Sequence, residues 1–244
     1  MKKVIFLSLI FNLSIFGDYS NHIDSKIVID ELVSKHGFDE SYVIEVLKNA
    51  EKREEMLQSV AKPAEKTKTW DEYKAIFIKT KRIRDGKKFI SKNITTLEKA
   101  EKEFGVPKEI ITAILGVETN YGSNKGGYRV IDSLTTLGFD DPRRSKFFRR
   151  ELIEFFLLTR ENNLDILNTK GSYAGAMGYG QFISSSYRAY AIDYDGDGYA
   201  DLFDSVDDSI GSTASYLARH GWKREGKIVT RTYPNNVRKF YKPH

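Results

Sequence analysis

Glu118 is the residue whose type and position most directly suggest acid–base chemistry. On a helix that begins at Pro107, the residues Ile111, Leu115 and Glu118 lie at positions i, i+4 and i+7, so the carboxyl group continues an apolar stripe. Apolar neighbours and the negative end of the helix dipole both disfavour a carboxylate at this place. The pattern predicts a carboxyl group that stays protonated near neutral pH, as a general acid requires.

The same glutamate also has a purely structural interpretation. A glutamate at a helix end can accept backbone N–H groups or pair with a cation, and from the helix alone this role is favoured over catalysis. The catalytic interpretation of Glu118 therefore depends on the residues that surround it in the sequence.

A second candidate for chemistry is the acidic run at residues 193–204. Oxygen-bearing residues there have the spacing of an EF-hand calcium loop, and Gly198 stands where such a loop turns sharply. The expected ligands, of which the tyrosine acts through its backbone carbonyl, are Asp193, Asp195, Asp197, Tyr199, Asp201 and Asp204. Asp204 replaces the usual glutamate at the last position, so its shorter arm should weaken bidentate binding and relax selectivity between ions. The alternative is a solvated acidic turn.

The composition limits the class of protein. The 244 residues are 40% hydrophobic, which is enough for a substantial core, and they include no cysteine. Disulfides, thiolate metal sites, a cysteine nucleophile and a lipid-modified cysteine are therefore excluded for this chain. The 39 Lys and Arg residues nearly balance the 34 Asp and Glu residues, with a formal net charge of +5. This mild basicity suits an anionic polymer. The sequence lacks the clustered basic stripe that is expected of a nucleic-acid-binding protein.

Residues 1–17 have the features of a secretory signal peptide. Two lysines precede a short apolar run at residues 4–16, and Gly17 is a small residue at the expected cleavage point. The run is too short for a comfortable membrane span, and no later segment is apolar enough for one. We expect an exported protein with no stable membrane span after cleavage. The alternatives are an uncleaved anchor and a buried N-terminal helix.

Helical spacing of apolar residues dominates the remaining sequence and predicts a mainly α protein. Residues 27–50 form an expected helical hairpin, in which Gly37 ends the first helix and Asp39 caps the second. The capping box from Thr69 to Glu72 predicts a helix that continues through residue 80 and ends near residue 86. Further helices are expected at residues 93–104, from 107 to Glu118, at 149–160, and at 206–220 after a capping box of Ser205 and Asp208.

The polar segment 62–68 contains a proline and is expected to connect two parts of the chain. We therefore divide the sequence into the signal peptide at residues 1–17, an N-terminal helical lobe and linker at 18–68, a core at 69–222, and a short tail at 223–244. The glycine-rich run at residues 171–180 is not a phosphate-binding loop, because it lacks a Gly-Lys-Ser/Thr ending and follows no convincing strand.

Four segments, in this order, resemble the membrane-bound lytic murein transglycosylase B family. They are residues 116–122, residues 141–144, the block at 170–182, and Tyr216 with the His-Gly-Trp sequence at 220–222. The glycine placement in the thirteen-residue block 170–182 makes the resemblance specific. It covers the chain from about residue 70 to residue 222.

The resemblance implies a lysozyme-like α-rich catalytic core with an EF-hand-like loop and an N-terminal helical lobe. It implies a lyase that cleaves the β-1,4 bond between N-acetylmuramic acid and N-acetylglucosamine without water and leaves 1,6-anhydro ends. By motif position, Glu118 would be the acid that protonates the leaving oxygen and then the base for the C6 hydroxyl. Such a reaction needs no second carboxylate and no positioned water. The loop would carry a structural Ca²⁺, with another cation as an alternative.

The resemblance also implies residues that bind the substrate. Ser172 and Gln181 match positions that line the cleft near the catalytic glutamate. The positions that match the saccharide- and peptide-binding groove are Tyr73, Arg143, Arg144 and Tyr216. Arginine can engage the carboxylates of peptide stems with two hydrogen bonds, and tyrosine offers a ring face and a hydroxyl to a sugar. Apart from the resemblance, the two arginines would be interpreted as a solvated surface pair.

The expected partners are peptidoglycan glycan strands, with cell-wall synthesis or secretion machinery as an open second class, in the bacterial periplasm. No nucleic-acid partner is expected. The family has a further segment after the His-Gly-Trp element that contributes to the cleft, whereas this sequence stops at His244. No residue of the tail is assigned to the site. Two alternatives to a lytic transglycosylase stay open: a lysozyme-like hydrolytic muramidase and a non-catalytic peptidoglycan-binding protein.

Overall fold

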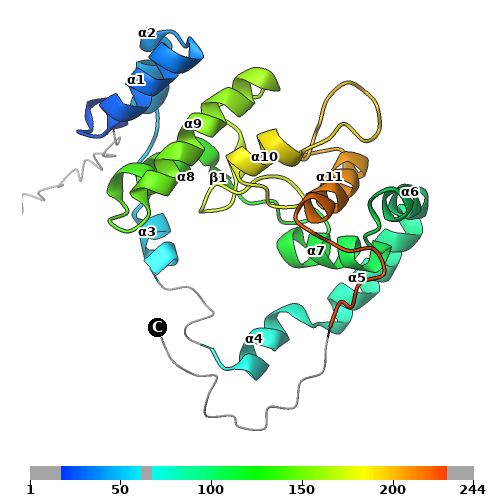
Figure 1. Cartoon of the computed structure of the whole chain (residues 1–244). Coiled ribbons are helices and arrows are strands. Elements are labelled where there is room, and N and C mark those ends of the chain that lie inside the picture. The colour runs from blue at the N-terminus through cyan, green and yellow to red at the C-terminus, as the bar shows by residue number, and fades with distance from the viewer. Residues whose placement is uncertain (1–17, 62–67, 230–244) are drawn as a thin grey trace, which may run out of the picture.

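A computed structural model describes residues 18–61 and 68–229 of the chain (Figure 1). The expected signal peptide, most of the expected linker and the last residues of the tail lie outside these described residues. The described part is mainly helical, which confirms the predicted fold class. Its two short strands, β1 (Tyr128–Arg129) and β2 (Lys170–Gly171), pair in antiparallel orientation. No helix in the described ranges has the length and hydropathy needed to span a membrane.

Helices account for most of the described residues. In chain order they are η1 (Tyr19–Asn21), α1 (Ser25–His36), α2 (Glu40–Lys48), α3 (Glu54–Ala61), α4 (Trp70–Phe77), α5 (Thr80–Lys92), α6 (Ile94–Phe104), α7 (Lys108–Thr119), α8 (Val130–Asp140), α9 (Ser145–Glu161), α10 (Ser184–Tyr190) and α11 (Val206–Arg219).

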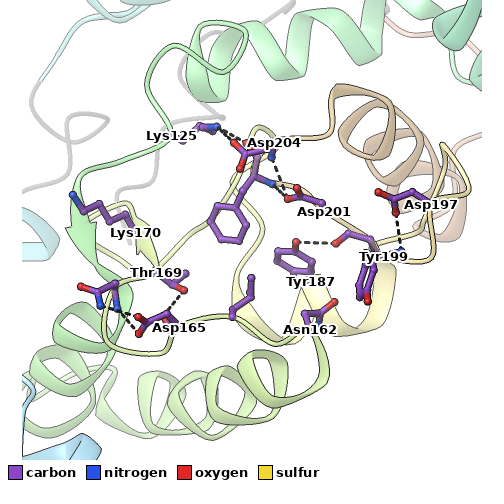
Figure 2. Close-up of a pocket in the computed structure, with 14 residues that line it drawn as sticks. Lys125, Asn162, Asp165, Thr169, Lys170, Tyr187, Asp197, Tyr199, Asp201 and Asp204 are labelled. Atoms are coloured by element: carbon purple, nitrogen blue, oxygen red, sulfur yellow. Dashed lines mark hydrogen bonds and ion pairs between the residues drawn. The ribbon is translucent and has the colours of Figure 1, made fainter.

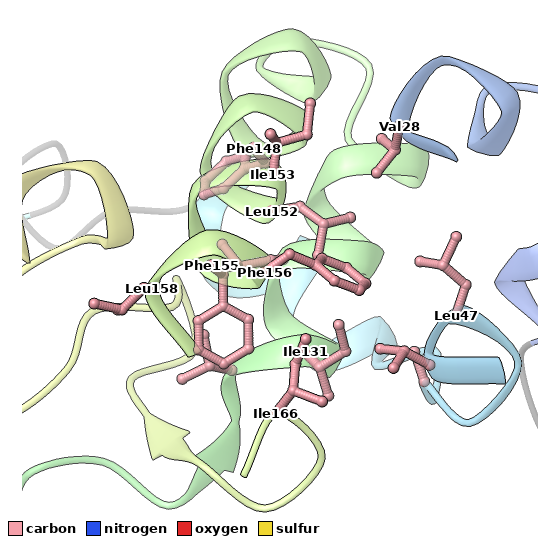
Figure 3. Close-up of a cluster of buried hydrophobic side chains, with 14 of the residues drawn as sticks. Val28, Leu47, Ile131, Phe148, Leu152, Ile153, Phe155, Phe156, Leu158 and Ile166 are labelled. Atoms are coloured by element: carbon pink, nitrogen blue, oxygen red, sulfur yellow. The ribbon is translucent and has the colours of Figure 1, made fainter. Parts of the chain in front are cut away.

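The first of two hydrophobic clusters joins the N-terminal helices to α8 and α9 (Figure 3). Val28 of α1 and Leu47 of α2 are fully buried, and they belong to the same cluster as Phe155 and Phe156 of α9. Figure 1 shows α1 and α2 beside α9 at the upper left of the molecule. The expected N-terminal lobe is therefore packed directly on α8 and α9, and its boundary at residue 68 stays a prediction.

The second cluster lies between α6, α7 and α11 and positions the candidate active site. Leu97 of α6, Ile111 and Leu115 of α7, and Ile210 of α11 are fully buried in it. The apolar stripe predicted on the helix of Glu118 is thus confirmed for Ile111 and Leu115. Burial of such side chains contributes about 1.5–3 kcal/mol each.

Helix ends follow the predicted capping chemistry in several places. Gly37 ends α1 in a left-handed conformation with φ 65°, which a glycine adopts without strain. The Asp39 carboxylate accepts the Tyr42 N–H at 3.0 Å, and Thr69 with Glu72 forms a complete capping box before α4.

The expected helix from residue 70 to residue 86 is wrong, because the chain forms two helices there. Helix α4 ends at Phe77, whose carbonyl accepts a hydrogen bond from the Arg82 guanidinium at 2.8 Å, and α5 begins at Thr80. Gly86 lies inside α5. A Cβ at that position would come 2.5 Å from the Tyr121 hydroxyl, so this glycine permits close packing and does not end a helix.

Candidate active site

Glu118 lies in the last turn of α7, at the wall of a pocket of about 330 Å³. The residues that line this pocket with it are Ile114, Gly180, Gln181, Phe182, Ile183, Ser186, Thr213, Tyr216 and Leu217. They come from α7, from the end of the glycine-rich run and the segment after it, and from α10 and α11. The buried stripe of α7 therefore ends in a carboxyl group that faces a cavity open to solvent.

The Glu118 side chain contacts solvent on its pocket side and protein atoms on its other sides. This partial burial raises the pKa of Glu118 above its ordinary value. Within residues 18–61 and 68–229, burial is the single cause of this shift, and no hydrogen bond or ion pair to the carboxyl group is found. The geometry therefore opposes the structural interpretation, in which this glutamate is capped or paired.

Thr119 ties the glycine-rich segment to the end of the same helix. Its hydroxyl donates to the Tyr179 carbonyl at 2.9 Å and accepts the Gly122 N–H at 2.9 Å. Thr119 is buried, and both bonds are partly buried. The residue next to Glu118 thus holds the backbone directly before Gly180, which lines the pocket, and the motif did not assign this role to it.

The glycines around Glu118 allow two tyrosine rings to pack against the backbone. A Cβ at Gly116 would lie 2.6 Å from the Tyr121 hydroxyl, and a Cβ at Gly122 would lie 2.0 Å from the Tyr179 ring. Gly122 also has a φ of 82°, in the region that favours glycine. Both glycines of the motif are therefore required by packing beside the candidate acid.

Gln181 and Tyr216, two of the predicted substrate-binding residues, share the pocket with Glu118. Gln181 has a φ of 51°, and its amide donates to the carbonyls of Lys125 and Gly178 at 3.2 and 3.1 Å. A positive φ for a residue other than glycine is strained and is often found at functional sites. The Tyr216 ring stacks on the His220 ring with a centroid distance of 4.0 Å.

The other predicted substrate-binding residues do not line this pocket. The Ser172 hydroxyl accepts the Ala176 N–H at 3.1 Å and so stabilises its own turn. Arg143 and Arg144 line a separate hollow of about 440 Å³ with Tyr173. Tyr73 lies on α4, at the lower edge of Figure 1, where its ring packs on Phe77 at 5.1 Å between centroids and no residue of the helix is buried.

The acidic run forms an open loop between α10 and α11. The carboxylates of Asp193, Asp195 and Asp197 each place an oxygen atom within 4.8 Å of the others. Three converging carboxylates suit a hard cation such as Ca²⁺, which prefers oxygen ligands. This half of the predicted ligand set is brought together by the structure.

The other predicted ligands face different partners. Asp201 accepts the N–H groups of Phe203 and Asp204 at 2.7 and 3.1 Å, and the Asp204 carboxylate pairs with the Lys125 ammonium at 3.3 Å. The Tyr199 side chain is exposed, and this residue lines the cavity shown in Figure 2. That cavity of about 560 Å³ lies beside the loop and also contains Lys170.

Asp208 is a structural residue of the loop that sequence reasoning assigned only to a capping box. Ser205 does cap α11 by accepting the Asp208 N–H at 3.1 Å. The Asp208 carboxylate, however, is fully buried and accepts N–H groups from Tyr194 at 2.6 Å, Asp195 at 3.2 Å and Asp201 at 2.7 Å. The reciprocal capping bond is therefore replaced by three bonds that fix the loop.

Comparison with known proteins agrees with the resemblance. Residues 24–242 match the family model described as the transglycosylase SLT domain. The chain is 41% identical over 222 residues to the membrane-bound lytic murein transglycosylase B of Escherichia coli, covering 87% of this chain and 61% of that protein. The chain thus spans less than two thirds of the length of this curated relative.

Solved structures resemble the fold as well. The Escherichia coli lytic transglycosylase Slt35 in complex with calcium superposes with a TM-score of 0.81 and 40% identity, over 87% of this chain and 68% of that one. SltB3 from Pseudomonas aeruginosa, in complex with NAG-anhNAM-pentapeptide, superposes with a TM-score of 0.70 and 27% identity, over 82% and 53%. The resemblance to the lytic murein transglycosylase B family is confirmed, and this chain belongs to the transglycosylase SLT domain family.

Proposed function

We propose that this protein is a peptidoglycan lytic transglycosylase in which Glu118 acts first as an acid and then as a base. The observation that carries the proposal is a glutamate with a raised pKa and no bonded partner in the described part of the chain, facing a pocket that also contains Gln181 and Tyr216. A protonated carboxyl group beside a sugar-sized pocket is the requirement for glycosidic bond cleavage. Family membership supports the substrate class.

In the proposed first step, Glu118 transfers its proton to the glycosidic oxygen, and the bond from C1 of N-acetylmuramic acid to that oxygen breaks. The N-acetylglucosamine side leaves with a hydroxyl group, and Glu118 becomes a carboxylate. In the second step, the C6 hydroxyl oxygen bonds to C1 while its proton passes to Glu118. The acid is regenerated and no water is consumed. Because the nucleophile belongs to the substrate, one carboxyl group serves both steps.

Gln181 and Tyr216 have complementary tasks in this proposal. The Gln181 amide is fixed by two carbonyl groups, so it can hold a sugar substituent or the Glu118 carboxyl group in one orientation. The Tyr216 ring stacks on His220 and lines the pocket, so it offers an aromatic face to a sugar ring. Ser172 contributes indirectly, since its hydroxyl holds the turn that leads to Gln181.

The peptide stems are proposed to bind at Arg143 and Arg144. These arginines line their own hollow beside Tyr173, away from the reacting bond, where a stem carboxylate can accept hydrogen bonds from a guanidinium. The relative SltB3 was solved with a NAG-anhNAM-pentapeptide, a ligand that carries such a stem. Tyr73 is proposed as a further groove residue on α4.

Ca²⁺ is proposed as a structural ion of the loop at residues 193–204. The converging carboxylates of Asp193, Asp195 and Asp197 supply the oxygen ligands, and the relative Slt35 was solved with calcium. The carbonyl of Tyr199 and the carboxylates of Asp201 and Asp204 complete the proposed set. The ion supplies charge and rigidity to the loop, and the proposed proton transfers involve Glu118 alone.

We propose export by the segment 1–17 to the bacterial periplasm, where the proposed substrate lies, with cell-wall synthesis or secretion machinery as an open second class of partner. Fractionation of cells that express the full chain tests the location. Finding the protein only in the cytoplasm would contradict it.

The deciding experiment compares Glu118→Gln with the unchanged protein on purified sacculi. We expect the rate of solubilisation to fall by about 10²–10⁴-fold, the usual contribution of general acid–base catalysis. Glu109→Gln is the matched control, because Glu109 is an exposed glutamate in the first turn of the same helix. Unchanged lysis by Glu118→Gln would remove Glu118 as the catalytic residue. No lysis by the unchanged protein would leave a non-catalytic peptidoglycan-binding protein, and reducing ends in the products would indicate a hydrolytic muramidase.

A further inference from the structure

Lys125 connects the acidic loop to the pocket of Glu118. It lies between α7 and β1, and its ammonium group donates to the Phe203 carbonyl and pairs with the Asp204 carboxylate at 3.3 Å (Figure 2). The Lys125 side chain is 29% exposed, whereas the Asp204 side chain is 86% exposed. The position of the Lys125 side chain is therefore fixed by the surrounding protein, and its ion pair restrains the Asp204 side chain at the end of the loop.

The backbone of the same lysine forms part of the pocket wall. Its carbonyl accepts a hydrogen bond from the Gln181 amide at 3.2 Å, and Gln181 lines the pocket with Glu118. The ammonium group also lies 5.0 Å from the centre of the Tyr179 ring, which places its charge near the aromatic face. Tyr179 in turn accepts the hydrogen bond from Thr119, the neighbour of Glu118.

A backbone hydrogen bond also joins the end of the acidic loop to the glycine-rich segment. The Tyr179 N–H donates to the Leu202 carbonyl at 3.0 Å, so the loop and the glycine-rich segment are joined at two points. A movement of the loop end at residues 202–204 is therefore transmitted to both Tyr179 and Gln181. Of the two connections, only the one through Lys125 carries charge.

We propose that Lys125 is a positioning residue that couples cation binding in the loop to the placement of Gln181 beside Glu118. Its charge has two opposing effects. It holds the loop end against the pocket wall, and it competes with a cation in the loop for the Asp204 carboxylate. The part of this inference that concerns catalysis rests on the proposed function, whereas the part that concerns the metal does not.

The test is Lys125→Met, which keeps the length of the side chain and removes its charge. Calcium affinity, measured by isothermal titration, should become about two- to five-fold tighter, the range for loss of one exposed ion pair. The kcat on purified sacculi should fall by about ten-fold or more, because the backbone carbonyl that accepts from Gln181 is no longer anchored to the loop through the Lys125 ammonium group. Lys125→Arg keeps the charge and should restore both values toward those of the unchanged protein.

Lys170→Met is the matched control. Lys170 lines the same cavity, and within the described ranges 18–61 and 68–229 it forms no ion pair. Calcium affinity and kcat should both stay within two-fold of the unchanged protein. The comparison separates the contacts of Lys125 from a general loss of positive charge near the loop.

Movement of the two quantities in opposite directions supports the coupling. A loss of both calcium affinity and activity would assign Lys125 a merely structural role, and no change in either would overturn the proposal.

The side-chain amide signal of Gln181, observed by ¹⁵N NMR and assigned from its loss in Gln181→Leu, provides a readout independent of catalysis. It should shift when calcium is added to the unchanged protein and stay constant in Lys125→Met. If the unchanged protein has no lytic activity, the proposed function fails while this signal still decides the coupling.

Discussion

Gly122→Ala is a substitution whose effect follows directly from the geometry beside Glu118. The new Cβ would lie 2.0 Å from a carbon of the Tyr179 ring, far inside van der Waals contact, so the ring must move. The backbone of Gly122 has a φ of 82°, which an alanine adopts only with strain. Tyr179 is also the acceptor for Thr119, so the displacement reaches the end of α7.

The expected loss of stability has two parts. The left-handed backbone costs an alanine about 1–2 kcal/mol, and forcing extra volume into a packed site costs about 1–3 kcal/mol. The sum is about 2–5 kcal/mol, and a chain of this size loses about 2–4 °C in Tm for each kcal/mol, so Tm should fall by about 4–20 °C.

Gly37→Ala separates the cost of the left-handed backbone from the cost of the collision with a ring. Gly37 has a φ of 65°, and no atom lies within 4 Å of a Cβ built there, so an alanine meets the backbone strain without the collision. Its Tm should fall by only about 2–8 °C. Thermal unfolding followed by circular dichroism, with lytic activity measured on the same samples, gives both comparisons. Equal losses of Tm in the two variants would show that the collision with the Tyr179 ring contributes nothing to the loss of stability.

Three further predictions concern charged groups. Burial raises the pKa of Glu118 above its ordinary value of 4.5, so the protonated side chain stabilises the folded state at pH values below 4.5, and this contribution is lost as the pH rises through the raised pKa. Glutamine stays neutral at every pH. In thermal melts, Glu118→Gln should therefore gain stability relative to the unchanged protein between pH 4 and pH 7. Asp208→Asn replaces one carboxylate oxygen with an NH₂ group, which then faces a buried backbone N–H group of the loop as a second donor. The substitution should lower the free energy of unfolding by about 1–3 kcal/mol and weaken calcium binding in a titration. Arg143→Met combined with Arg144→Met should raise KM by about ten-fold or more for strands with peptide stems and leave KM unchanged for strands without stems, in a paired kinetic assay.

The sequence predicts those parts of the site that local spacing determines. The burial of Ile111 and Leu115 on one face of α7 depends only on helical geometry, and the convergence of three carboxylates in the acidic loop depends only on the order of its residues. Capping at Asp39 and Thr69 also follows from neighbours within three positions. Each of these features is set by interactions within a few residues along the chain.

The missed features depend on contacts between distant segments. Helix α8 is buried on nearly all sides, so its residues show no apolar stripe, and its position could not be predicted from periodicity. The break between α4 and α5 is stabilised by Arg82, and Gly86 is explained only by the ring of Tyr121. Sequence order likewise gives no sign that Lys125 meets Asp204 across the loop.

Contacts between distant segments also explain why the predicted binding residues lie in two separate cavities. Gln181, expected near Glu118, and Tyr216, expected in the substrate groove, both line the pocket of Glu118, since they belong to segments that pack beside α7. Arg143 and Arg144 lie in the connection between α8 and α9, and the packing of those helices places them in a separate hollow with Tyr173. Whether two motif positions share a cavity is decided by packing between elements.

The central claim, that Glu118 catalyses a cleavage without water, is tested most directly by digesting purified sacculi in water enriched in heavy oxygen and analysing the products by mass spectrometry. We expect 1,6-anhydro ends that are lighter than reducing ends by the mass of one water and carry no heavy oxygen, and no such products with Glu118→Gln. Reducing ends that contain heavy oxygen, or the same products from both proteins, would contradict this claim.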